Sequence, residues 1–235
     1  TAIGGSPVWC SIGRRPTTDG PPNQLRMNMD ERMATPTAYM DWPFDGVSVG
    51  YAYNNLFGMD DAPGRVRICW GRGFEAGLNA KNDGMVHNGG INDTDFAGVS
   101  WDIYKKGNRF AYLQSFVAMD VMNFPDFSDP MTSAFYDYAF NTMTGGAYGR
   151  ANIGNIWHTS GVYQDKFQNL NYFGSLAWSR TDPNERGMLN DPSAAGPNTG
   201  SENGYAMHVG VRYDIPDSLF KIGAEYNHGS KYWIS

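Results

Sequence analysis

The residues best suited to chemistry in this chain are the charged side chains of one long polar stretch, GRRPTTDGPPNQLRMNMDER, at residues 13–32. Arg14 and Arg15 end an apolar segment, and Asp19 begins a run that mixes acids with further arginines. Acids on a loop that faces arginines on a wall create a transverse electric field, which selects solutes in a water-filled passage. We predict that this stretch faces three later arginines: Arg65, Arg67 and Arg212. The alternative is an external loop with ordinary surface ion pairs.

Motifs for catalysis or for a resident metal are absent from the sequence. It contains no GxSxG, HExxH, Walker or GxGxxG signature. His87, Asp93 and Asp95 offer ligand atoms in HNGGINDTDF, but the spacing of a calcium loop is missing, so a solvated loop is favoured. Cys10 and Cys69 belong to no CxxC motif, and two isolated buried thiols fit better than a disulfide. We predict no enzyme activity, no metal and no cofactor.

The composition favours strands and argues against nucleic-acid binding. Glycine (29), tyrosine (14) and tryptophan (7) are frequent, a bias typical of strands and turns. Charged residues make up 18% of the 235 residues and the net charge is −6, so no basic surface is available for nucleic acid. No apolar run is long enough for a transmembrane helix, although membrane strands give no such signal.

Alternation of apolar and polar residues predicts nine strands. Tyr205, Val209 and Tyr213, for example, alternate with small or charged residues. The first seven strands are expected at residues 7–15, 47–53, 65–72, 96–104, 109–121, 153–164 and 170–179. The hairpin GYAMHVGVRYDIPDSLFKIGAEYNHGS at residues 204–230 provides the last two. The signal is weakest for 153–164.

Long and short connections follow each other in strict order. The long ones are residues 16–46, 73–95, 122–152 and 180–203, and the short ones are residues 54–64, 105–108, 165–169 and 215–218. This order describes an antiparallel up-and-down meander, with long loops at one end and short turns at the other. No linker marks a second domain, so residues 1–235 are expected to form one β unit.

The alternating strands fit either a soluble β-sheet or a transmembrane β-barrel, and three features favour the barrel. The asymmetry of the connections is the pattern of outer-membrane barrels. The polar face is rich in small residues with isolated charges, as in a lumen wall. The aromatic residues are spaced for two membrane interfaces: Tyr205 and Tyr213 lie about 26 Å apart, at about 3.3 Å per residue.

Because the sheet of a membrane barrel must close on itself, we predict that the barrel contains more than these nine strands. An open edge in lipid leaves unpaired backbone groups, and bacterial barrels have an even strand number. The chain ends at KYWIS, just after a strand. We expect this chain to be a segment of a larger barrel, with strands missing at one or both ends.

Three stretches carry a resemblance to a known family: SPVWCSIGRRPTTDGPP, CWGRGFEAG with the later DTDF, and KIGAEYNHGSKYWIS. They resemble a family of outer-membrane proteins of Gram-negative bacteria that is classed as a domain of unknown function and regarded as porin-like. The resemblance covers almost the whole chain. It implies a barrel architecture and an outer-membrane location, whereas no catalytic residue is assigned in the family.

These observations together predict a passive channel for small hydrophilic solutes in the bacterial outer membrane. The expected pore-lining residues are Arg14, Arg15, Asp19, Arg65, Arg67, Asp102, Arg212, Lys221 and Glu225. The expected lipid-facing girdle is Trp70, Trp101, Trp178, Tyr205, Tyr213 and Tyr226. Besides lipid and solutes, the expected partners include a second copy of the chain or a periplasmic or extracellular protein. The alternatives are a barrel sheath that holds a partner, such as a redox protein, and a soluble secreted β-sheet binding protein.

Overall fold

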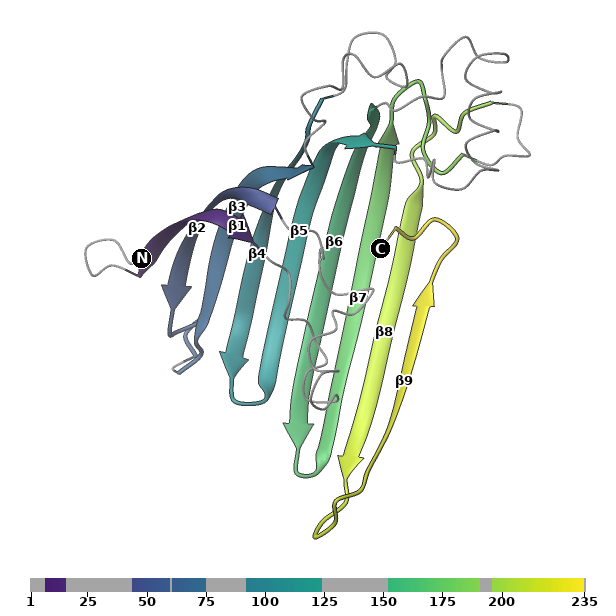
Figure 1. The fold of residues 1–235 in the computed structure, drawn as a ribbon. Coiled ribbons are helices and arrows are strands. Elements are labelled where there is room, and N and C mark those ends of the chain that lie inside the picture. The colour runs from purple at the N-terminus through teal and green to yellow at the C-terminus, as the bar shows by residue number, and fades with distance from the viewer. Residues whose placement is uncertain are drawn as a thin grey trace.

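The computed structural model describes residues 7–15, 44–59, 61–74, 92–123, 152–190 and 196–234 and shows one antiparallel β-sheet (Figure 1). Its strands are β1 (Val8–Arg15), β2 (Phe44–Tyr53), β3 (Gly64–Phe74), β4 (Thr94–Lys106), β5 (Arg109–Met122), β6 (Asn152–Phe167), β7 (Leu170–Pro183), β8 (Asn203–Asp214) and β9 (Lys221–Gly229). The described ranges contain no helix, and hence none long and apolar enough to span a membrane. The predicted all-β fold is confirmed.

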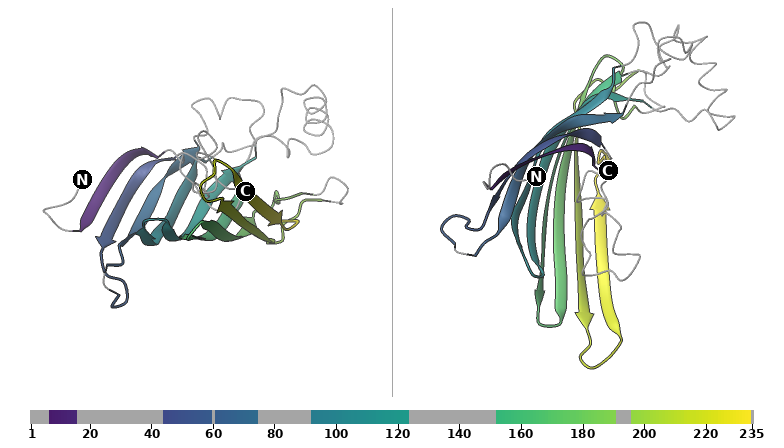
Figure 2. Two further views of the ribbon diagram at one scale, coloured as in Figure 1. Left: turned by 90° about the horizontal axis from the view of Figure 1, so that it is seen from below. Right: turned by 60° about the vertical axis from the view of Figure 1, so that its left-hand side comes forward.

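The strands lie in the sheet in the order in which they occur in the chain. Each strand pairs antiparallel with its sequence neighbours, so the predicted up-and-down order is confirmed. The sheet twists and curves, and β1 and β9 form its two edges (Figure 2). Tight turns join β4 to β5 and β6 to β7 at one end of the sheet, whereas the longer connections leave from the other end. This open sheet is consistent with part of a β-barrel.

The first seven strands begin and end within four residues of their predicted limits, including β6, whose signal in the sequence was the weakest. The segment with the weakest alternation forms the longest strand, of 16 residues. Its two faces are both partly apolar, because Ile156 and Val162 are buried on one side while Trp157 and Tyr163 are exposed on the other. Hydrophobic residues on both faces hide the period of two that identifies a half-buried strand.

Large apolar side chains of the strands are exposed on one face of the sheet, whereas most buried side chains, apolar as well as polar, lie on the other face. We call the face with Leu176 and Val209 the outer face, and the face with Ser175 and His208 the inner face. On β7, Leu176 is 69% exposed, whereas Ser175 on the other side is 1% exposed. The pattern extends across the sheet: except for Asp165, every buried polar side chain of the described residues lies on the inner face.

The two cysteines lie on opposite faces of the sheet. Cys10 pairs with Val49 and shares the outer face with it, whereas Cys69 pairs with Ser48 on the inner face. Ser48 donates a hydrogen bond from Oγ to the Cys69 sulfur at 3.2 Å. Neither cysteine forms a disulfide, as predicted, but both are half-buried rather than buried.

A close backbone approach at Gly64 lets an aromatic side chain cross β3. Tyr53 of β2 pairs with Gly64, and its hydroxyl reaches β4 beyond. There it donates a hydrogen bond to the Ile103 carbonyl at 2.7 Å and accepts one from Trp101 Nε1 at 2.8 Å. A Cβ at Gly64 would lie 2.5 Å from the Asp102 carbonyl oxygen and would also meet the tyrosine ring. Only glycine leaves room for this crossing.

Gly64→Ala should therefore destabilise the protein. We expect a loss of about 1–3 kcal/mol in the free energy of unfolding, because the added methyl group overpacks the site. The measurement is denaturant unfolding in detergent micelles, followed by tryptophan fluorescence. Gly161→Ala is the matched control, since a Cβ there meets its nearest atom at 3.7 Å. Equal stability of the two variants would contradict the crossing.

Candidate functional site

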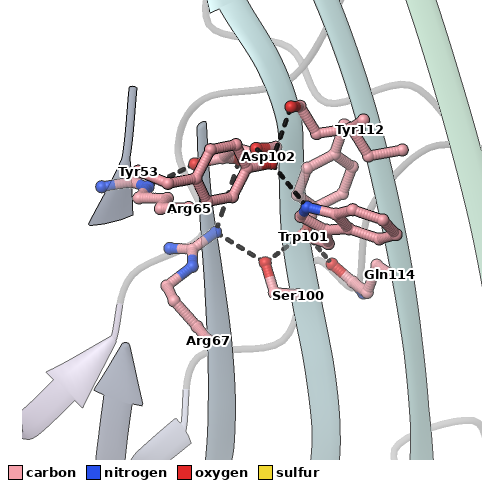
Figure 3. Close-up of polar contacts among 9 residues, drawn as sticks. Tyr53, Arg65, Arg67, Ser100, Trp101, Asp102, Tyr112 and Gln114 are labelled. Carbon is pink, nitrogen blue, oxygen red and sulfur yellow. Dashed lines mark hydrogen bonds and ion pairs between the residues drawn. The ribbon is translucent and has the colours of Figure 1, made fainter. Parts of the chain in front are cut away.

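A cluster of polar side chains on the inner face of β3, β4 and β5 forms the candidate site (Figure 3). Arg67, Ser100 and Gln114 occupy paired positions on the three strands. The next inner row is Arg65, Asp102 and Tyr112. Because side chains at paired positions point to the same side of a sheet, two short rows bring all six residues together. The predicted grouping of Arg65, Arg67 and Asp102 on one face is thus observed.

A chain of hydrogen bonds runs through this cluster in one direction. Arg67 donates to Ser100 Oγ at 2.6 Å, Ser100 Oγ lies 2.9 Å from the Tyr112 hydroxyl, and that hydroxyl donates to Gln114 Oε1 at 2.6 Å. The tyrosine proton is engaged with Gln114, so Ser100 must donate to Tyr112. The ends of the chain are two buried donors without a hydrogen-bond partner, Arg67 Nε and Gln114 Nε2.

The charge of the cluster is carried by two arginines and one buried carboxylate. Asp102 forms an ion pair with Arg65 Nε, and its other oxygen lies 3.8 Å from an Arg67 nitrogen. The Asp102 side chain is 8% exposed, whereas the Arg65 side chain is 46% exposed. Asp102 fixes both guanidinium groups, and the three side chains together carry one net positive charge.

Three further residues of the predicted pore lining, Arg212, Lys221 and Glu225, lie on β8 and β9. Arg212 donates from Nε to Asp214 Oδ1 at 2.8 Å, and Lys221 pairs in register with Asp214. Glu225 lies 3.2 Å from His208 Nε2. Arg212, Lys221 and Glu225 therefore share the inner face with Arg67, but they lie on strands far from it in the sheet.

Arg14 lies on the outer face, which differs from the prediction that it faces Arg65, Arg67 and Arg212. β1 extends to Arg15, so the alternation of side chains along the strand keeps Arg14 on the same face as Ile12. Its guanidinium binds Asp45 at 2.8 Å. Arg15 pairs through its backbone with Phe44. Residues 16–32, which include Asp19 and most of the stretch predicted to select solutes, lie outside the described residues. His87 lies outside them as well.

Arg14 belongs to a row of alternating charges across four strands of the outer face. The row is Arg14, Asp45, Arg72 and Asp95. Arg72 binds Asp95 at 3.1 Å and also Asp93 at 2.6 Å. Two of the acids considered as cation ligands therefore pair with an arginine. Within the described residues, no group of three or more His, Cys, Asp or Glu side chains is arranged to hold a metal.

Aromatic residues of the outer face form two lines with aliphatic residues between them. Towards the long connections lie Trp70, Trp157, Trp178 and Tyr205. Towards the short turns lie Tyr53, Trp101, Tyr163, Tyr172 and Tyr213. All six residues of the predicted girdle share this outer face, with Tyr226 opposite Val209. Trp157, Tyr53, Tyr163 and Tyr172 were not included in that prediction.

The inner face is apolar towards the long connections. Phe44, Phe96, Ala118 and Ile156 form a buried cluster there, and Phe116 packs against it. Met188, from the connection after β7, and Ile234, after β9, cover the same cluster. The inner face therefore carries charged side chains near the short turns, beside a small apolar cluster of Phe110, Tyr112 and Val162, and a larger apolar cluster near the long connections.

Asp102→Asn should lower the free energy of unfolding by about 2–3 kcal/mol. It leaves Arg65 and Arg67 without their buried counter-charge, and the cost is reduced because Arg65 is half-exposed. Denaturant unfolding in micelles measures the change. Asp45→Asn removes a carboxylate from an exposed pair and should have little effect. If both variants unfold at the same denaturant concentration, the structural role of Asp102 is contradicted.

Comparison with protein families gives a match that covers the whole chain. Residues 1–235 match the family described as "Protein of unknown function (DUF3373)". No curated protein and no solved structure gives a significant match. The chain belongs to the DUF3373 family.

Proposed function

We propose that the chain is part of an outer-membrane β-barrel that acts as a porin-like channel for passive diffusion of small hydrophilic solutes. The observation that carries this proposal is an exposed apolar outer face opposite an inner face that holds buried polar side chains. Large apolar side chains are exposed on the outer face from β1 to β9, whereas buried polar side chains gather on the inner face. In water the outer face would be an aggregation-prone surface. In lipid it is the expected surface of a barrel wall.

The apolar part of the outer face is also bounded at both ends by charged residues, as expected for a surface that crosses a bilayer. Aliphatic residues in its middle include Ile68, which is 66% exposed. Charged pairs bound it at both ends: Arg14 and Arg72 pair with acids near the long connections, and Arg109 binds Asp165 at 2.7 Å near the short turns. The two aromatic lines lie just inside these charges, where tyrosine and tryptophan are favoured at membrane interfaces. The proposed location is the bacterial outer membrane, and the proposed contacts are lipid and small solutes.

The charged side chains of the inner face support the passage of hydrophilic solutes. Arg65, Arg67 and Asp102 place fixed charges on it, and the hydrogen-bond chain to Gln114 holds Arg67 in place. Solutes would diffuse through the lumen and be filtered by its width and charge. The net positive charge of this cluster favours anions over cations.

Conductance across planar bilayers tests the channel. The purified complete protein should give ohmic currents, and Arg67→Gln should lower the ratio of anion to cation permeability roughly twofold by removing a lumen charge. The reversal potential in a salt gradient measures this ratio. Arg72→Gln is the matched control, since it removes the same charge from the outer face and should leave the ratio unchanged.

The possible outcomes separate the proposed function from its alternatives. If the protein enters bilayers and carries no current, the channel fails and a sheath for a protein partner becomes the better explanation. If the protein stays monodisperse in buffer without detergent, the membrane location fails as well.

A further inference from the structure

The segment that follows β9 turns back across the inner face instead of leaving the sheet. We call residues Ser230–Ile234 the strap. Figure 1 shows the chain turning from the end of β9 towards β8 and β7. The strap begins with two hydrogen bonds to β8: Ser230 N–H donates to the Tyr205 carbonyl at 2.8 Å, and Tyr205 N–H donates to Ser230 Oγ at 2.9 Å.

The strap follows one row of paired residues across three strands. Gly204 of β8 pairs with Ser179 of β7, which pairs with His158 of β6. The Ile234 N–H donates to Ser179 Oγ at 3.4 Å, and Trp233 reaches His158 with a distance of 5.3 Å between ring centroids. Three successive strands therefore contribute to holding the strap.

Small side chains in this row make room for the backbone of the strap. A Cβ at Gly204 would lie 2.6 Å from Trp233 Cα and would also meet the Tyr232 carbonyl oxygen. Ser179 is fully buried beneath the strap. The sequence thus has its smallest residues where the strap crosses β8 and β7, and a ring for stacking where it ends at β6.

The far end of the strap is fixed by aromatic and apolar contacts. His158 stacks on Phe116 of β5 with a distance of 5.0 Å between ring centroids, so Phe116, His158 and Trp233 form a continuous aromatic row. Ile234 packs against the buried apolar cluster of the inner face. Stacked rings and burial of this kind oppose displacement of the strap.

We infer that the strap is the size-restricting element of the passage at the end of the sheet that carries the long connections, with Trp233 as its main obstruction. This inference rests on the proposed function, because it requires a lumen on the inner face. A strap that crosses three strands and places an indole ring over the inner face of β6 narrows that lumen. Size selection is then set by the chain segment after β9.

Single-channel recording of the complete protein with two independent variants tests this inference. Trp233→Ala removes the obstruction, and Gly204→Ala displaces the strap from its row without changing any of its residues. Trp233→Ala should raise the conductance by roughly twofold and admit larger sugars in liposome-swelling assays, because ion flow depends on the width of the constriction. Gly204→Ala places a methyl group between the wall and the strap, so it should push the strap towards the lumen and lower the conductance.

Two control variants separate obstruction from general damage. Trp157→Ala removes a tryptophan from the outer face, next to His158 in sequence, and should leave the conductance unchanged. Gly174→Ala adds a methyl group on the outer face of β7, 4.0 Å from the nearest Val209 atom, and should also have no effect.

Failure of the inference differs from failure of the proposed function. If the wild type conducts, and folded Trp233→Ala and Gly204→Ala conduct equally well, the strap does not restrict the passage. If neither the wild type nor the two variants conduct, the channel is excluded and the restriction with it. If a variant conducts where the wild type does not, the strap acts as a complete closure and the inference is supported.

Discussion

The division between an exposed apolar outer face and an inner face with buried polar side chains is the constraint on which the rest of the structure depends. Continuous antiparallel pairing fixes which side chains share a face, and a slip of one residue in any strand would exchange the faces of that strand. Ile68 and Leu176 would then point inward, while Arg67 and Ser175 would enter the apolar surface. In the proposed barrel, the exposed apolar residues of the outer face would meet lipid, and the charged pairs at both ends of that face would lie at the limits of the bilayer.

The inner face is organised by the same constraint. Within the polar cluster of β3, β4 and β5, the Arg67–Ser100–Tyr112–Gln114 chain and the Asp102 ion pairs provide partners for most of the buried polar groups. Towards the long connections, apolar and aromatic side chains replace the charges, and the strap covers them. A lumen with charges near one end and an aromatic obstruction near the other would select solutes by charge at one end and by size at the other.

Local patterns predicted the strands because alternation and turn residues are properties of neighbours in the sequence. The nine strands and their order follow from them, and β6, which is apolar on both faces, gave the weakest signal. The sequence also identified Arg67 and Asp102, but it missed Tyr112 and Gln114, which become visible only when β5 is paired with β4 across the Gly107 turn. Arg14 was predicted to line the pore, whereas it lies on the outer face, because the direction of its side chain depends on where β1 ends. The strap could not be foreseen, since contacts with three distant strands set its path.

The central claim is that one face of the sheet contacts lipid and the other a water-filled lumen, and the surroundings of successive side chains along β7 test it most directly. Spin labels are attached one at a time at residues 174–178 of the complete protein in lipid vesicles, after both native cysteines have been replaced. Collision rates with oxygen, which partitions into lipid, and with a water-soluble nickel chelate are then measured by electron paramagnetic resonance. We expect labels at Gly174, Leu176 and Trp178 to favour oxygen, and labels at Ser175 and Ala177 to favour the chelate. Uniform values along the strand, or the opposite alternation, would contradict a sheet that faces lipid on one side and a water-filled lumen on the other.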